Sequence, residues 1–160
     1  MAENIEVYNY MLQSGYIFFS KEPAVISTVL GSCVSVALYD TKLKYGGMNH
    51  FRFPRAENLE TTAFYAKPAI YKLILFFSEN KSDLKNLVAQ IFGGAYNPKY
   101  MAHDIGKENV AVAKMMLKKY NIPIISEDIG GQLGRKIVYN TFTNEAIIAK
   151  VERLRADDWY

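Results

Sequence analysis

The sequence predicts a single domain of the α/β or α+β class, in which helices pack on mixed β-sheets. Three observations lead to this fold class. The chain has 160 residues, a length that fits one domain. Half of its residues are hydrophobic and 22% are charged, as in ordinary globular proteins that bury a sizeable core. Strand-like segments outnumber helix-like ones, and the two kinds alternate along the chain.

Apolar and β-branched runs predict the first strands. Residues 25–30 and 34–39 form two such runs, and Gly31-Ser32-Cys33 separates them as a turn or a kink. Residues 45–53 predict a further strand, which opens with Gly46-Gly47.

Helices are predicted at two places, with a strand between them. Pro68 fits the first turn of a helix, where its missing N–H costs nothing, and this helix extends to about Ser78. Residues 87–92 predict a short strand that ends at Gly93-Gly94. Residues 109–120 give the clearest helical pattern, since apolar side chains recur there at three- and four-residue spacing.

The last third of the chain is predicted to be mostly extended. Residues 122–129 form an extended run that leads into a glycine-containing loop. Residues 136–142 and 146–151 alternate enough to form a hairpin. The tail, residues 153–160, is charged, and we expect it to fray beyond a core of residues 14–152.

Composition excludes several classes of protein. A single cysteine rules out a disulfide framework and any multi-cysteine zinc or iron–sulfur site, and two histidines make a His-rich metal site improbable. The net charge of +3 is too small to indicate a nucleic-acid partner. No apolar stretch is long enough for membrane insertion, and the acidic N-terminus does not resemble a signal peptide. We expect a cytoplasmic protein without a metal or another cofactor.

Cys33 and His50 are the candidates for chemistry. Cys33 follows Gly31-Ser32, and a glycine-containing turn can present a nucleophile and aim backbone N–H groups of Gly31 and Ser32 at an oxyanion. His50 lies seventeen residues later, close enough to reach the thiol if the intervening segment returns as an adjacent strand. Such a pairing activates a cysteine nucleophile. The competing interpretation is structural: a lone cysteine in an apolar strand is commonly a small buried hydrophobe.

A third group is expected to orient the imidazole. Ser27, Thr28 and Asn49 are the candidates near the pair. Alternation along the strand places Ser27 and Val29 on one face and Thr28 and Leu30 on the other. If Leu30 faces the core, Ser27 has the freer hydroxyl.

Several motifs together resemble one family. They are Leu30-Gly-Ser-Cys-Val-Ser-Val36, Gly46-Gly-Met-Asn-His-Phe-Arg-Phe-Pro54, Ile91-Phe-Gly-Gly-Ala95, Ile105-Gly106 with Asn109, and Glu127-Asp-Ile-Gly-Gly131 with Gly134-Arg-Lys136. Their residues and order resemble the CheD family of chemoreceptor glutamine deamidases, over about residues 14–152. The family is also similar in its active-site arrangement to bacterial toxin deamidases, which implies a cysteine-hydrolase core of β-sheets flanked by helices.

The resemblance implies an activity and a set of residues. The family hydrolyses glutamine side chains of methyl-accepting chemotaxis receptors to glutamate and releases ammonia. Carried onto this sequence, Cys33 is the nucleophile and His50 the general acid/base. The family's third position, a threonine six residues before the cysteine, is Ser27 here, and Thr28 is the poorer substitute.

The resemblance also implies a second partner and an alternative function. Some family members bind CheC, a phosphatase of the chemotaxis response regulator. The alternative to an enzyme is therefore a chemotaxis adaptor with weak or no deamidase activity, which binds a receptor or CheC.

Overall fold

The computed structural model describes residues 7–56, 58 and 61–159. The acidic residues 1–6, on which the signal-peptide expectation rests, and Tyr160 of the tail lie outside the described residues. Nine strands, two helices and two short 3₁₀ turns make up the described chain. In order they are β1 (Tyr8–Met11), β2 (Ile17–Ser20), β3 (Ala24–Leu30), β4 (Val34–Asp40), β5 (Gly46–Asn49), α1 (Ala66–Glu79), a 3₁₀ turn (Leu84–Asn86), β6 (Leu87–Gly93), α2 (Ile105–Lys119), β7 (Ile124–Ile129), β8 (Gly134–Asn140), β9 (Ala146–Val151) and a 3₁₀ turn (Ala156–Asp158).

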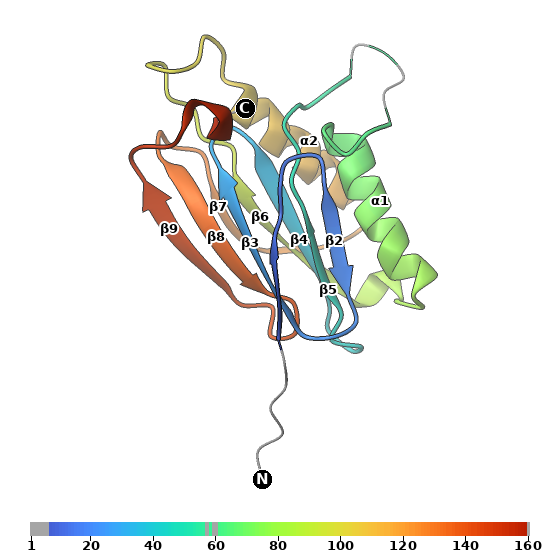
Figure 1. The fold of residues 1–160 in the computed structure, drawn as a ribbon. Helices are drawn as coiled ribbons and strands as arrows, with labels where there is room; N and C mark the ends of the chain where they lie inside the picture. Colours follow the sequence, from blue (N-terminus) through green and yellow to red (C-terminus); the bar gives the residue numbers. More distant parts are fainter. Residues whose placement is uncertain (1–6, 57, 59–60, 160) are drawn as a thin grey trace.

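Two mixed sheets and one helical layer form the domain, which confirms the predicted fold class. One sheet has four strands in the order β1-β3-β8-β9, and the other has five in the order β2-β5-β4-β6-β7. Each sheet contains one parallel pair, β1 with β3 and β6 with β7, and its other pairs are antiparallel. Helices α1 and α2 pack on the five-stranded sheet, so that this sheet lies between the helices and the four-stranded sheet (Figure 1).

Burial explains why the central strand reads as a continuous apolar run. All seven residues of β4 are buried, because the helices cover one face of its sheet and the four-stranded sheet covers the other. On β3, burial alternates residue by residue, with Ile26, Thr28 and Leu30 facing inward. The inner face of the four-stranded sheet thus closes a second core against the first sheet.

Four details differ from the sequence prediction. The short strands β1 and β2 were not predicted, because four residues give too little periodicity. Helix α2 begins four residues earlier than predicted, where the Asp104 side chain accepts a hydrogen bond from the Lys107 N–H. Strand β5 ends at Asn49, and Phe51 and Phe53 form only isolated bridges beyond it.

The fourth difference concerns the tail, for which the predicted fraying is wrong. Trp159 is only 1% exposed and packs in a small core with Ala95 and Met101. Its backbone approaches Gly31 so closely that a Cβ on this glycine would lie 2.7 Å from the Trp159 Cα. The end of the described chain is therefore packed against the turn that carries Cys33, because a large aromatic side chain there has apolar surface to bury.

Candidate active site

Cys33 lies in the turn between β3 and β4 and is 2% exposed. The end of β6 supports this turn from behind, since the Gly94 N–H donates to the Cys33 carbonyl oxygen at 2.9 Å. Gly93 allows this approach: its φ is +102°, and a Cβ there would lie 2.3 Å from the same oxygen. The Gly93-Gly94 pair therefore fixes the backbone of the candidate nucleophile.

His50 directly follows β5, and its ring is held by β3. The ring Nδ1 lies 2.8 Å from Thr28 Oγ1, and the same hydroxyl donates to the Leu12 carbonyl oxygen at 2.7 Å. A hydroxyl has one proton, so both contacts are satisfied together only when His50 Nδ1 carries the proton and donates. The second ring nitrogen, Nε2, then has a free lone pair, and it has no partner among the described residues.

The structure corrects the predicted orienting residue from Ser27 to Thr28. Leu30 does face the core, but the imidazole is on that side too, so the buried hydroxyl of Thr28 reaches it. Ser27 points to the opposite face of the sheet, where it pairs with Val138 on β8. The alternation of β3 was predicted correctly, whereas the side on which His50 lies was not. Asn49, the remaining candidate, instead accepts from the Val36 N–H and donates to the Ala69 carbonyl oxygen.

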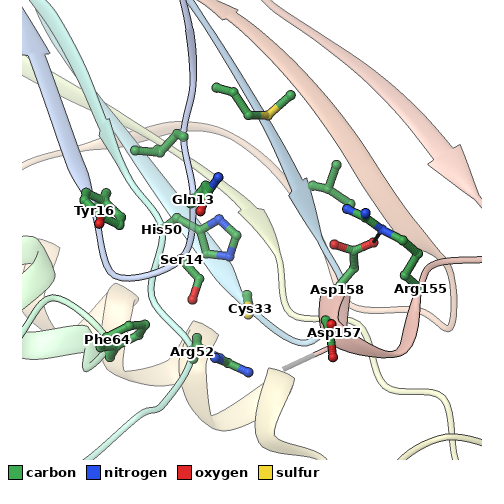
Figure 2. A pocket seen from close by; sticks show the side chains of 13 residues that line it. Gln13, Ser14, Tyr16, Cys33, His50, Arg52, Phe64, Arg155, Asp157 and Asp158 are labelled. Carbon is green, nitrogen blue, oxygen red and sulfur yellow. Dashed lines mark hydrogen bonds and ion pairs between the residues drawn. The ribbon is translucent and has the colours of Figure 1, made fainter.

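A cavity of about 550 Å³ opens over Cys33 and His50. Figure 2 shows the imidazole and the thiol facing this space, with the ion-paired side chains of Arg155 and Asp158 across from them. The cavity lies between the loop from β1 to β2 and the end of the described chain, and its walls also come from β3 and from the segment after β5. Its lining residues are Met11, Leu12, Gln13, Ser14, Tyr16, Val29, Cys33, His50, Arg52, Phe64, Arg155, Asp157 and Asp158.

Burial keeps both candidate catalytic groups uncharged at neutral pH. It raises the pKa of the Cys33 thiol from 9.0 to about 12, against an opposing effect of the Arg52 charge. It also lowers the pKa of His50 from 6.5 to about 4, and the Arg52 charge acts in the same direction. The free protein therefore holds a neutral thiol beside a neutral imidazole, and not a preformed ion pair.

The backbone of the turn offers fewer oxyanion donors than predicted. The Ser32 N–H donates to the Trp159 carbonyl oxygen at 3.1 Å, and the Ser32 hydroxyl donates to the same oxygen. Both donors of Ser32 are therefore already used by the packed tail, and neither is free to face an oxyanion in this structure. Because Gly31 has no side chain, the backbone of Trp159 can pack directly against it. The backbone N–H of Cys33 lowers the pKa of its own thiol.

Asn109 is a site residue whose role the sequence did not reveal. It is fully buried on α2, and its side-chain amide donates to the Ser32 carbonyl oxygen at 3.0 Å and to the Arg52 carbonyl oxygen at 2.9 Å. It thus ties the turn before Cys33 to the segment after His50. The sequence placed Asn109 at the start of a helix, which explains a polar residue without a tertiary contact.

These groups can perform acyl chemistry at a carbonyl carbon. A buried thiol, a histidine with a free Nε2 and a cavity above both are the parts of a cysteine hydrolase. In the part of the chain that the structure describes, no three His, Cys, Asp or Glu side chains gather where a metal ion could bind. Neither described helix is both long and apolar enough to cross a bilayer.

Known proteins match this chain over most of its length. Residues 52–150 match the model of the family described as "CheD chemotactic sensory transduction", a span that begins two residues after His50. A protein of Sulfurimonas denitrificans is 34% identical, and the match covers 89% of this chain and 94% of that protein. Similar proteins of Anaeromyxobacter dehalogenans and Archaeoglobus fulgidus are 37% and 40% identical, over 81% and 76% of this chain and 77% and 80% of their own lengths. Each of the three is named a probable chemoreceptor glutamine deamidase CheD.

Proposed function

The chain belongs to the CheD family, and from that premise we propose that it is a protein-glutamine deamidase that acts on methyl-accepting chemotaxis receptors. The reaction hydrolyses a glutamine side chain to glutamate and releases ammonia. The names of the relatives support the substrate class, because each names a chemoreceptor glutamine deamidase. Action on the cytoplasmic part of the receptor follows from the same resemblance.

One observation carries the proposed mechanism. Cys33 and His50 line one cavity, and Thr28 occupies the Nδ1 side of the imidazole, so that Nε2 is left as a base. The three residues thus match the roles of a nucleophile, a base and a group that orients the base. A buried cysteine with a purely structural role needs neither a cavity above it nor a histidine held in one tautomer.

The first half of the reaction forms a thioester. His50 Nε2 takes the proton of the Cys33 thiol while the sulfur attacks the carboxamide carbon of the glutamine. The resulting oxyanion is stabilised by the positive charge of Arg52, which lines the cavity. The imidazolium then gives its proton to the amide nitrogen, the C–N bond breaks, and ammonia leaves.

The second half consumes a water molecule. His50 Nε2 takes a proton from water, and the hydroxide oxygen attacks the thioester carbon. The C–S bond breaks, Cys33 recovers its proton from the imidazolium, and the glutamate leaves. A neutral resting pair suits this cycle, since His50 is a base at the start of each half.

The experiment that tests the proposal is intact-mass analysis of a chemoreceptor cytoplasmic fragment after incubation with the protein. Each deamidated glutamine gains about one mass unit, because –NH₂ is replaced by –OH. The comparison variants are Cys33→Ala and His50→Gln. The chain's other histidine, His103, is exposed and outside the site, so His103→Gln is the matched control for the second variant.

We expect the wild type and His103→Gln to add mass, and the two site variants to add none. Wild-type activity that survives in Cys33→Ala would refute Cys33 as the nucleophile. A folded wild type that modifies no receptor fragment would refute the enzyme and favour the adaptor, whose next test is binding to CheC. CheC as a partner rests on the family resemblance alone.

A further inference from the structure

The outer face of the four-stranded sheet carries a row of side chains that runs directly from the catalytic cavity. The register pairs Met11 of β1 with Ser27 of β3, Ser27 with Val138 of β8, and Val138 with Ile147 of β9. Directly paired residues project from the same face of a sheet. We call Met11, Ser27, Val138 and Ile147 the outer row.

Three of the four side chains in the outer row are apolar and exposed. Met11 is 59% exposed, Val138 37% and Ile147 71%. Ser27, between Met11 and Val138, is partly buried. Helices α1 and α2 pack on the other sheet, on the far side of the molecule (Figure 1). Bulky apolar side chains that share one sheet face in this way are typical of a surface that binds another protein.

The row meets the site at Met11, which also lines the cavity over Cys33. Val29, the next outward-facing residue of β3 after Ser27, lines the cavity as well. The outer face of the sheet and the mouth of the cavity are therefore one continuous surface.

The size of the substrate requires contacts beyond the cavity. A glutamine side chain reaches its carboxamide carbon through three carbon–carbon bonds of about 1.5 Å each, so the substrate backbone must lie across the mouth. A specific protein interface buries roughly 800 Å² on each partner, far more than one side chain supplies. The segment that bears the glutamine must therefore rest on the surface next to the mouth.

We infer that the segment of the substrate protein that bears the glutamine docks on the outer row as a helix. This inference rests on the proposed function and adds the surface that selects the substrate. Three strand spacings of about 4.8 Å place Ile147 roughly 14 Å from Met11. A helix covers that distance in two to three turns, so its apolar side chains at three- and four-residue spacing from the glutamine rest on Val138 and Ile147.

The test uses Ile147→Lys in the full chain, with Ile125→Lys as the matched control. Both isoleucines lie on edge strands and are more than half exposed, at 71% and 56%, but Ile125 is on β7 of the other sheet. The probe is a purified cytoplasmic fragment of a chemoreceptor. Deamidation of the fragment gives KM and kcat, and binding of the same fragment is measured in a Cys33→Ala background. Ile147→Gln provides a milder second variant.

We expect Ile147→Lys to raise KM and weaken binding by about tenfold, as for an interface residue whose apolar contact is lost, while kcat stays within about twofold. Ile147→Gln should show a smaller change in the same direction, and Ile125→Lys none. Unchanged KM and binding in folded Ile147→Lys would overturn the inference. The inference would also be overturned if the wild type were a dimer that Ile147→Lys dissociates without a change in KM. In that case the outer row would join two copies of the chain.

Failure of the proposed function gives a different result. A wild type that binds the fragment without deamidating it, with binding that Ile147→Lys weakens, refutes the enzyme and supports the docking surface. A wild type that deamidates the fragment with the same KM in all variants refutes only the docking surface. A wild type that does neither overturns both.

Discussion

In the proposed mechanism, the hydroxyl of Thr28 determines which nitrogen of His50 acts as the base, and Thr28→Val tests this directly. Valine has the same shape and suits a strand, but it lacks the hydroxyl. The substitution removes the 2.8 Å contact to His50 Nδ1 and the 2.7 Å hydrogen bond to the Leu12 carbonyl oxygen. The imidazole is then no longer held in the tautomer that leaves Nε2 unprotonated.

The magnitude follows from the cost of an unpaired buried group. Leaving the Nδ1–H without an acceptor costs about 1–3 kcal/mol, which corresponds to a loss of roughly fivefold to 150-fold in kcat. The loss should appear in kcat and not in KM, because the tautomer matters only when the proton moves. Thr28→Ser keeps the hydroxyl and should stay within a few-fold of the wild type.

The assay is the rate of mass gain on a receptor fragment at saturating substrate, measured well below the unfolding temperature of each variant. Ser27→Ala is the control, because Ser27 faces away from His50 on the other side of β3. A kcat of Thr28→Val equal to that of the wild type would refute the assignment of Thr28 as the residue that orients His50. A larger loss of kcat in Ser27→Ala than in Thr28→Val would restore the residue that the sequence favoured.

Three further predictions follow from the same site. At pH 8 a pKa of about 12 leaves about one thiol in 10⁴ ionised, so alkylation of Cys33, the only cysteine, should accelerate about tenfold per pH unit from 7 to 10; a plateau below pH 8 would indicate a preformed ion pair. Folding lowers the pKa of His50 from 6.5 to about 4, so the unfolded chain binds the proton first. The stabilisation that comes from keeping His50 neutral should be fully present above pH 6.5, and the free energy of unfolding should fall by up to about 3 kcal/mol toward pH 4. In urea denaturation, His50→Gln should not show this pH-dependent loss, whereas His103→Gln should show it as the wild type does. Asn109→Ala leaves the carbonyl oxygens of Ser32 and Arg52 without their donor, so it should lower the free energy of unfolding by about 2 kcal/mol and also lower kcat; unchanged values of both would contradict a positioning role.

The packed tail forms part of the site, which the sequence did not predict. The sequence 153–160 is charged, and charge alone predicts a solvated end. Trp159 instead packs in a small core, and its carbonyl oxygen accepts hydrogen bonds from both donors of Ser32, next to Cys33. One wall of the cavity, with Arg155, Asp157 and Asp158, is therefore supplied by residues more than a hundred positions from Cys33.

Local patterns in the sequence were sufficient for the fold class and for most of the elements. The apolar run of β4 and the helical spacing in α2 follow the periodicity of a single strand or helix, which is why they can be predicted from the sequence alone. The motif Gly31-Ser32-Cys33 and the later His50 likewise identified the pair that the structure brings to one cavity.

The residues that support this pair became apparent only in the folded chain. Alternation along β3 separates Ser27 from Thr28, but the strand itself does not show on which face the imidazole lies, because β5 belongs to the other sheet. The depth of burial that shifts the pKa values of Cys33 and His50, the hydrogen bonds of Asn109 and the contact with Trp159 all join segments distant in sequence. Such contacts depend on how the two sheets and the helices pack, and the periodicity of single elements contains no information about that packing.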